Sequence, residues 1–251
     1  MKGYFIGGCH VSAFPYPESS GFVHQVGQQQ EMKTQIVHAH VGLSKLEQIL
    51  PGITVQERQV FVFQLGNYEF GGSLTSVLKT VFNLKLQPRP TGMVTQSAAA
   101  HPAQPSSLRI DHHFARGKKV QALRNNKKPV KQWLLTSLYS SLYLAGFFVL
   151  NRHGAHFKLL SQFITQHPKA CIVFLTPLPA VGFLDNQLRK LGGWIMKRKL
   201  RTHEHVQWIN THEVIPASEA YFVDDAHLNV RAHGMLAQAI NQRITGWQGN
   251  D

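Results

Sequence analysis

Two short stretches, far apart in the chain, hold residues whose types and spacing suit nucleophilic chemistry. Near the N-terminus Cys9 follows Gly7 and Gly8, and near the C-terminus Asp224 stands three residues before His227. A cysteine is strongly nucleophilic once it ionises. A histidine base needs a partner that fixes its tautomer and stabilises its cation, and a carboxylate one turn away can do both. The two stretches therefore predict a cysteine nucleophile served by a histidine–aspartate pair.

The position expected for Cys9 supports this role. A short apolar run at 4–6 indicates a buried strand, and the glycines after it indicate a turn into a helix. The residue after such a turn lies at the C-terminal edge of a sheet, where open α/β folds bind ligands. A helix N-terminus at this place would also favour a thiolate. The alternative is a buried structural cysteine, because free cysteine is among the most buried residue types.

Three neighbouring residues are alternatives for parts of this chemistry. Ser12, one helical turn after Cys9, is a second candidate nucleophile, although it is expected inside the helix. His10 could favour the thiolate, but adjacent side chains around a turn often point apart, so a surface histidine is the simpler interpretation. Asp225 competes with Asp224 as the partner of the histidine base, and the spacing favours Asp224.

The elements that must position these residues follow from the hydrophobic pattern. Apolar runs that indicate buried strands alternate with segments whose apolar residues recur at helical spacing. This alternation predicts an α/β fold with a central parallel sheet of about five strands and helices on both faces. The expected strands are 4–6, 35–40, 60–64, 170–176 and 206–210, and the expected helices are 43–50, 74–82, 157–165, 183–200 and 230–244.

The motifs taken together resemble the SGNH (GDSL-type) hydrolase superfamily. In that family the nucleophile follows the first strand in a Gly-Asp-Ser motif, and an Asp-x-x-His pair precedes the last helix. The run 227–234 matches the usual continuation after that histidine, and 65–69 matches a Gly-and-Asn motif behind the third strand. The chain departs from the family at Gly8 and Cys9, which stand in place of Asp and Ser, and it has no spacer between Gly66 and Asn67.

The resemblance covers roughly 1–84 and 154–246, and it implies a three-layer α/β/α, flavodoxin-like fold. It also implies a hydrolase or acyltransferase that acts on an ester, either a carbohydrate O-acyl ester or a lipid ester, without a cofactor. Cys9, Asp224 and His227 would be the catalytic residues. The backbone N–H of Cys9, Gly42 and the side chain of Asn67 would stabilise the oxyanion. The alternative is a catalytically degenerate member of the same fold that binds an anionic polymer or a membrane surface.

Composition and charge bear on the partners. A chain of 251 residues fits a single SGNH-like domain over 1–251 with an insertion at about 85–153. The net charge is +13, and residues 85–131 contain ten Lys or Arg and a single acid, Asp111. The part at 87–130 is poor in apolar residues and is expected to be mobile. Beside a small-molecule or glycan ester, such basic patches favour an anionic polymer or a membrane surface, whereas nucleic acid is not favoured; the alternative is a solvated face.

The segment at 131–150 is expected to be an apolar helix. Residues 133–150 carry no charge, which is the lower edge of the length of a membrane span. Its serines and threonines make it amphipathic, so a helix buried against the sheet or lying on a membrane surface is favoured over a span.

Several other functions are not supported by the sequence. Two cysteines make no disulfide framework, and the first strand begins too early for a signal peptide, so a cytoplasmic setting is expected, with peripheral membrane association as an alternative. His38 and His40, or the adjacent His112 and His113, lack the spacing of a zinc site, so no metal is expected. The glycines before Cys9 lack the third glycine of a dinucleotide fingerprint.

Overall fold

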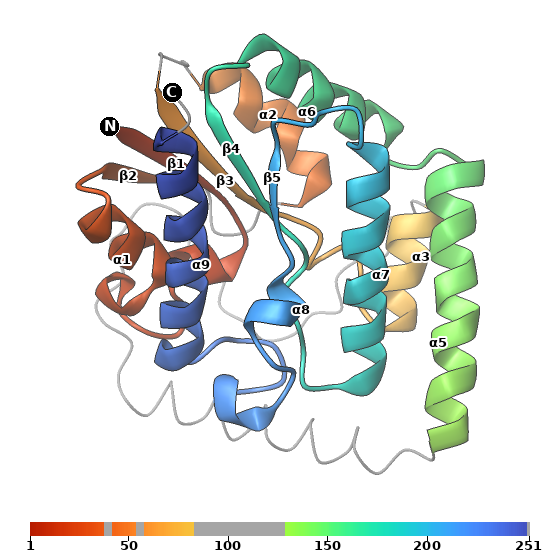
Figure 1. Cartoon of the computed structure of the whole chain (residues 1–251). Coiled ribbons are helices and arrows are strands. Elements are labelled where there is room, and N and C mark those ends of the chain that lie inside the picture. The colour runs from red at the N-terminus through yellow and green to blue at the C-terminus, as the bar shows by residue number, and fades with distance from the viewer. Residues whose placement is uncertain (38–41, 54–57, 83–128, 250–251) are drawn as a thin grey trace.

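A parallel sheet of five strands forms the centre of the fold (Figure 1). The structure is a computed structural model and describes residues 1–37, 42–53, 58–82 and 129–249. The strand order is β2-β1-β3-β4-β5 and every neighbouring pair is parallel. This is the flavodoxin-like order of a doubly wound α/β fold, and it confirms the fold class that the alternating pattern and the SGNH resemblance indicate. The strands are β1 Lys2–Gly7, β2 Lys33–Val37, β3 Gln59–Gln64, β4 Cys171–Leu175 and β5 Gln207–Ile209.

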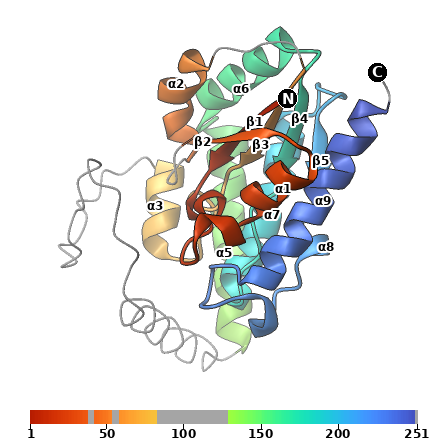
Figure 2. The ribbon, with the colours of Figure 1, turned by 90° about the vertical axis from the view of Figure 1, so that its left-hand side faces the viewer.

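Helices cover both faces of this sheet, as Figure 2 shows for α2 and α3 on one side and α9 on the other. Alternate residues of a strand point to opposite faces, so each face of β3 carries its own apolar set. The helices are α1 Phe22–Gln29, α2 Leu46–Ile49, α3 Leu74–Phe82, α5 Pro129–Leu144, α6 Gly154–Gln166, α7 Phe183–Lys199, α8 Thr211–Val214 and α9 Val230–Gln248.

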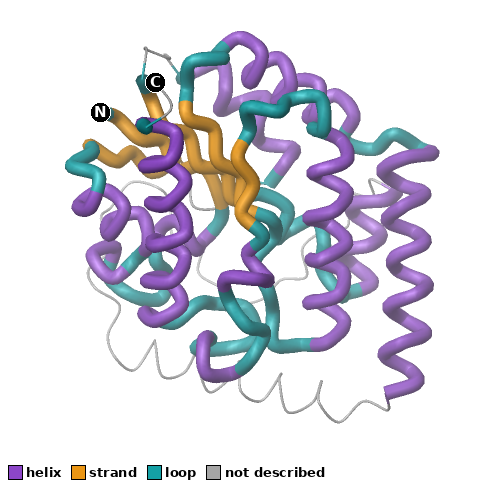
Figure 3. Tube along the Cα trace, in the orientation of Figure 1, coloured by secondary structure: helices purple, strands orange, loops and turns teal. Residues whose placement is uncertain are grey.

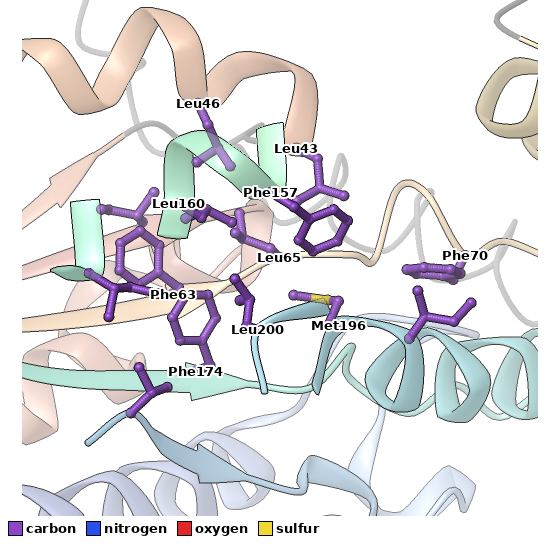
Figure 4. Packing of buried hydrophobic residues seen from close by; sticks show 14 of the residues in the cluster. Leu43, Leu46, Phe63, Leu65, Phe70, Phe157, Leu160, Phe174, Met196 and Leu200 are labelled. Carbon is purple, nitrogen blue, oxygen red and sulfur yellow. The ribbon is translucent and has the colours of Figure 1, made fainter. Parts of the chain in front are cut away.

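The larger core lies between the sheet and the helices α2, α3, α5, α6 and α7 (Figure 4). Phe63 of β3 and Phe174 of β4 stack there with ring centroids 4.7 Å apart. Leu160 of α6 and Met196 of α7 belong to the same cluster. The smaller core lies under α1 and α9 and includes the other face of β3, from which Val62 projects. The two cores hold the sheet between the helix layers and so fix the ends of its strands.

The apolar segment predicted at 131–150 forms α5 and a following π-helical turn, Ala145–Val149. One side of it is packed inside the protein: Tyr143 Oη donates a 3.0 Å hydrogen bond to the Gly71 carbonyl, and a Cβ on Gly146 would lie 3.1 Å from the side chain of Val81. No single helix in the described part of the chain is long and apolar enough to cross a membrane. Among the helices that the structure describes, α5 with its π-helical turn and α6, which meet at 64°, are long and apolar enough only when taken together as a bent pair.

Two expectations for local structure differ from the fold. The stretch 43–50 is not one helix but a 3-10 turn, a single α-helical turn and another 3-10 turn that ends at Gly52. Cys9 begins a 3-10 helix of only four residues, which ends where Ala13 adopts a positive φ of 60°. A helix this short has little dipole. The expectation that a helix N-terminus favours a thiolate at Cys9 is therefore wrong. The mobile basic part predicted at 87–130 falls almost wholly outside the described residues.

Candidate active site

The site lies at the C-terminal ends of β1 and β3, where the loops of the sheet's lower edge gather in Figure 3. From β1 the chain crosses to β2 on one side and returns to β3 on the other, which makes this pair the topological switch point of the sheet. Gly7 pairs with Gln64 in the ladder, and the Gly8 N–H donates to Gln64 Oε1 at 3.1 Å. The residues that follow the two strands are therefore held side by side.

The loop before α9 holds Asp224 and His227 in a fixed arrangement. Asp224 Oδ2 lies 2.6 Å from His227 Nδ1, and Asp224 Oδ1 accepts the backbone N–H groups of Ala226 at 2.8 Å and His227 at 2.7 Å. The Val223 N–H donates to the His227 carbonyl at 2.9 Å, and the Asn229 side chain caps α9 by accepting the Ala232 N–H. The carboxylate thus fixes both the loop and the orientation of the imidazole.

Cys9 meets the opposite side of the same imidazole. Because Nδ1 is held by Asp224, Nε2 is the ring nitrogen left for the hydrogen bond between His227 and the Cys9 side chain. Cys9 is half-buried, and the His227 side chain is 20% exposed. The structure therefore brings together the three residues that the motifs single out, with the histidine between the thiol and the carboxylate.

The electrostatics of this arrangement favour a charged His227. Burial acts to lower the pKa of His227, but the hydrogen bonds and charges of Asp224 and Cys9 outweigh it and raise the pKa to about 10. Burial acts to raise the pKa of Asp224, but its hydrogen bond to His227, the charge of His227 and the two backbone N–H donors hold it well below the usual range. At neutral pH the imidazole is therefore an imidazolium that faces the Cys9 sulfur.

The alternatives near Cys9 have other roles. Ser12 Oγ donates to the Cys9 carbonyl at 2.8 Å, so its hydroxyl stabilises the turn. His10 is not a surface residue as expected, because it is 3% exposed and its ring centroid lies 5.6 Å from that of His227. Burial, followed by the charges of His227, His233 and Arg189, holds the pKa of His10 well below its usual value, so His10 is a neutral neighbour of the imidazolium.

Of the predicted oxyanion residues, Gly42 is tied to the loop after β3. The Leu43 N–H donates to Glu69 Oε1 at 2.6 Å, and a Cβ on Gly42 would lie 2.6 Å from the same oxygen. Glu69 is buried, and burial raises its pKa against the hydrogen bonds that it accepts. Only glycine fits this close approach, and the contact joins the loop that begins at Gly42 to the loop that carries Asn67.

Asn67 is anchored through its side-chain oxygen. Its Oδ1 accepts the Leu178 N–H at 2.8 Å, and its Nδ2 is buried without a hydrogen-bond partner among the described residues. Leu178 follows β4, which neighbours β3 in the sheet. Asn67 thus bridges the loops after β3 and β4, and its role as an oxyanion donor stays a prediction.

Tyr68 takes the position beside Cys9, and reasoning from the sequence missed it. Its hydroxyl is hydrogen-bonded to the backbone and to the side chain of Cys9. Burial, then the charge of Cys9, raises the pKa of Tyr68 to about 12. Tyr68 directly follows Gly66 and Asn67 of the Gly-and-Asn motif, in a loop where Gly66 has a positive φ of 90°.

The described residues hold no group of three or more His, Cys, Asp or Glu side chains that could bind a metal ion. The other cysteine, Cys171, lies in β4 with 1% of its surface exposed, and burial raises the pKa of its thiol to about 12.

Sheet order and site together define a doubly wound α/β protein with a cysteine–histidine–aspartate arrangement at its switch point. No family model matches the sequence, and no curated protein matches it. Solved structures with a similar fold include a member of the lipolytic protein G-D-S-L family from Veillonella parvula, at 9% identity and a TM-score of 0.48, over 96% of this chain and 97% of that one.

A putative lipolytic protein of the G-D-S-L family from Desulfitobacterium hafniense is similar at 7% identity and a TM-score of 0.48, over 96% of this chain and 98% of that one. A lipase/acylhydrolase from Enterococcus faecalis is similar at 9% identity and a TM-score of 0.45, over 97% of each chain. Likenesses this distant say nothing about activity. The strand order and the order of the motifs agree with the SGNH resemblance indicated by the sequence.

Proposed function

We propose that the protein is an SGNH-type acyl hydrolase that uses Cys9 as its nucleophile and acts on an ester of a carbohydrate or a lipid. The observation that carries the proposal is the position of His227, which is hydrogen-bonded to Asp224 through Nδ1 and to the Cys9 side chain on its other side. A nucleophile, a base and a group that orients the base, each within hydrogen-bond reach of the next, are what nucleophilic catalysis requires.

The first half-reaction transfers the acyl group to Cys9. The thiolate attacks the carbonyl carbon of the ester and forms a C–S bond, and the carbonyl π electrons move onto oxygen to give a tetrahedral oxyanion. When this intermediate collapses, the C–O bond of the ester breaks, and the His227 imidazolium gives its proton to the departing alkoxide. The products are a thioester on Cys9 and a free alcohol, and His227 is left neutral.

The second half-reaction returns the enzyme to its starting state. Neutral His227 takes a proton from water while the water oxygen attacks the thioester carbonyl, and collapse of the second tetrahedral intermediate breaks the C–S bond. A carboxylic acid and a thiolate facing an imidazolium result. Asp224 keeps its charge throughout, because its role is to hold the imidazole and to stabilise the imidazolium. An acceptor alcohol in place of water would give acyl transfer by the same steps.

The side chains around the site favour an ester that carries either an apolar chain or a sugar ring that can stack on aromatic side chains. Phe14 is 39% exposed and meets the His227 ring edge-on at 5.2 Å, and Tyr68 is 46% exposed beside Cys9. Such rings bind acyl chains by apolar contact, and they also stack on sugar rings. A series of p-nitrophenyl esters with acyl chains from two to twelve carbons, compared with acetylated sugars, separates the two substrate classes.

The test of the proposed function is turnover with a trapped intermediate. Purified protein is mixed with p-nitrophenyl acetate, and the reaction is followed by release of p-nitrophenol and by mass spectrometry of the peptide that contains Cys9. We expect catalytic turnover and an added acetyl group on Cys9 in quenched samples. Turnover that persists in the Cys9→Ala variant, or an acetyl group that appears only elsewhere, would contradict the proposal. The Cys171→Ala variant is the matched control and should behave as the wild type.

A second candidate function, binding to an anionic membrane surface, is favoured by an exposed cluster where α7 runs beside the end of α5. Phe148, 41% exposed, contacts Trp194, 53% exposed, at a centroid distance of 5.8 Å, and Lys199 Nζ lies 5.1 Å above the Phe148 ring. Lys197 and Arg198 are exposed on the same helix. Aromatic rings beside basic residues suit the interface of a membrane with anionic lipids, where each basic residue contributes about 1 kcal/mol.

Co-sedimentation with vesicles tests this second function. We expect binding to phosphatidylglycerol vesicles and not to phosphatidylcholine vesicles, and weaker binding of the K197Q/R198Q variant. The K33Q/K45Q variant changes the charge equally at exposed positions near β2 and is the control. Equal binding of both variants would show that net charge alone acts. No binding of the wild type to either vesicle would show that the cluster is a solvated face.

A further inference from the structure

Tyr68 stands where charge would develop in the proposed reaction. Its hydroxyl is hydrogen-bonded to the backbone and to the side chain of Cys9. The backbone N–H of a nucleophile is the donor that faces the carbonyl oxygen of a bound acyl group once the sulfur attacks. A hydroxyl that reaches both that backbone and the sulfur therefore lies beside the place of the oxyanion.

The lack of a side chain at Gly8 leaves the space that the ring of Tyr68 occupies. A Cβ on Gly8 would lie 3.2 Å from Tyr68 Cε2 and 3.5 Å from Tyr68 Oη, which is a tight contact. The backbone of Gly8 does not itself require glycine, because its φ is −83°. Gly8 thus leaves room for the tyrosine ring over the turn that presents Cys9.

The side chain of the preceding residue is anchored by the loop after β4. Asn67 Oδ1 accepts the Leu178 N–H at 2.8 Å, and its buried Nδ2 has no hydrogen-bond partner among the described residues. Tyr68 is the residue of this loop whose hydroxyl is hydrogen-bonded to Cys9.

Resting on the proposed function, we propose that Tyr68 is a catalytic residue that donates a hydrogen bond to the oxyanion, together with the backbone N–H of Cys9. In the free protein its hydroxyl is paired with Cys9. When a carbonyl oxygen enters and takes negative charge, the hydroxyl turns its proton toward that oxygen. The covalent O–H bond of Tyr68 stays intact in this step, so the tyrosine stabilises the negative charge without transferring its proton.

The protonation of Tyr68 agrees with this role. With a pKa raised to about 12 by burial and by the charge of Cys9, the phenol of Tyr68 keeps its proton at neutral pH. A phenol that ionised at working pH would repel an oxyanion.

The first arm of the test is ester turnover by Tyr68→Phe, which keeps the ring over Gly8 and removes only the hydroxyl. We expect kcat to fall about 10²–10³-fold, the usual effect of losing one oxyanion donor. KM should change little, and the melting temperature should stay within a few degrees of the wild type. Tyr221→Phe is the control, since that ring stacks with Arg231 outside the site, and it should turn over at the wild-type rate. Unchanged turnover by Tyr68→Phe would overturn the proposal. Faster turnover would also overturn it, because it would show that the hydroxyl only blocks the site.

The second arm does not depend on ester hydrolysis. An alkyl trifluoromethyl ketone adds to a thiolate and gives a thiohemiketal oxyanion, whereas iodoacetamide alkylates the same sulfur without forming one. We expect Tyr68→Phe to bind the ketone at least about 10-fold more weakly, as measured by ¹⁹F NMR, and to react with iodoacetamide within a factor of about three of the wild type. Equal loss in both reactions would show that Tyr68 serves the thiolate instead, which overturns the proposal.

The two arms separate this inference from the proposed function. If the wild type hydrolyses no ester but forms the ketone adduct, and Tyr68→Phe weakens that adduct, the hydrolase proposal fails and the role of Tyr68 stands. If the wild type forms neither product, both proposals are wrong. Gly8→Ala gives a further check, because it should displace the ring and lower ketone affinity, with little additional loss in the G8A/Y68F double variant.

Discussion

The two cysteines of the chain lie in opposite surroundings, one inside the sheet and the other just beyond the end of a strand. Cys171 belongs to β4 and is enclosed by apolar side chains of the smaller core, so burial raises the pKa of its thiol to about 12. Cys9 stands just beyond the end of β1, half-buried, with His227 and Tyr68 at hydrogen-bond distance. The residue type is the same, and the position relative to the end of a strand decides what it can do.

The partners of Cys9 come from two loops. β1 pairs with β3, so the loop after β3 reaches Cys9 with Tyr68. The loop before α9 reaches Cys9 with His227, and α9 packs against α1, the first α-helix after Cys9. Inside β4, Cys171 pairs with Val60 of β3 and lies in the smaller apolar core. Burial there disfavours a charged thiol, whereas the thiol after β1 faces an imidazolium.

The largest expected effect is the loss of ester turnover in Cys9→Ala. Without the sulfur no thioester can form, so kcat should fall at least about 10³-fold, whereas Cys171→Ala should keep turnover within a factor of two. Steady-state rates with p-nitrophenyl acetate measure both. A Cys9→Ala variant with full activity would remove the functional difference between the two cysteines and would return Ser12 as a candidate nucleophile.

His227→Ala should have the next largest effect, and this effect should be confined to the reactions of Cys9. Loss of the proton donor and acceptor should lower kcat about 10²–10⁴-fold. It should also slow alkylation of Cys9 by iodoacetamide, since no cation then faces the sulfur, and leave alkylation of Cys171 unchanged. Peptide mass spectrometry reports both thiols in one experiment. An unchanged rate at Cys9 would mean that the imidazolium does not stabilise its thiolate.

The pH dependence of turnover should reverse when Cys9 is replaced by Ser. In the wild type His227 must be protonated to assist the departing alkoxide, so activity should fall as pH rises through about 10. In Cys9→Ser the histidine must be neutral to take the serine proton, so activity should be weak and should rise with pH. The midpoint should lie below 10, because Cys9 no longer raises the pKa of His227. The check is to measure kcat/KM from pH 6 to 11 for the wild type and for Cys9→Ser. Profiles of the same shape for the two proteins would contradict this reversal.

Stability should carry a smaller signature of the same pair. The folded-state pKa of His227 is raised to about 10, so its contribution is fully present below its unfolded value of about 6.5 and is lost as pH rises through about 10. The lowered pKa of Asp224 adds stability above about pH 4, which is lost at more acid pH.

The free energy of unfolding in urea should therefore decline from pH 6.5 to 10, by at most about 1.4 kcal/mol per pH unit for this one group. The decline should be smaller in His227→Gln, which cannot be charged. The same slope in both proteins would show that other groups cause it. Cys171→Ala is the control, because it removes a buried thiol without touching the pair, and its slope should match the wild type.

Most of the sheet and its helices could be predicted from the sequence because their apolar residues keep a regular period. The strand expected at 60–64 is β3 with one residue added, and the helix expected at 74–82 is α3 with the same bounds. The helix expected at 43–50 is instead one α-helical turn between two 3-10 turns, and the second of these runs on through Pro51 to Gly52.

The site was predicted where spacing alone sets the contact, as between Asp224 and His227, which are three residues apart. It was missed where a contact depends on the direction in which a loop turns. Tyr68 is hydrogen-bonded to Cys9, and a separation of 59 residues in the sequence gives no sign of that contact. The burial of His10 was missed for the same reason, since the four-residue 3-10 helix after β1 turns that ring inward.

The central claim is that His227 and Asp224 make Cys9, and not Cys171, a reactive nucleophile. The most direct measurement is a time course of iodoacetamide labelling of the folded protein at neutral pH, with each cysteine peptide quantified by mass spectrometry. We expect Cys9 to be labelled at least about 100-fold faster than Cys171, and the difference to vanish in urea, where both thiols are exposed and unpaired. Labelling of Cys171 first, or equal rates in the folded protein, would contradict the claim.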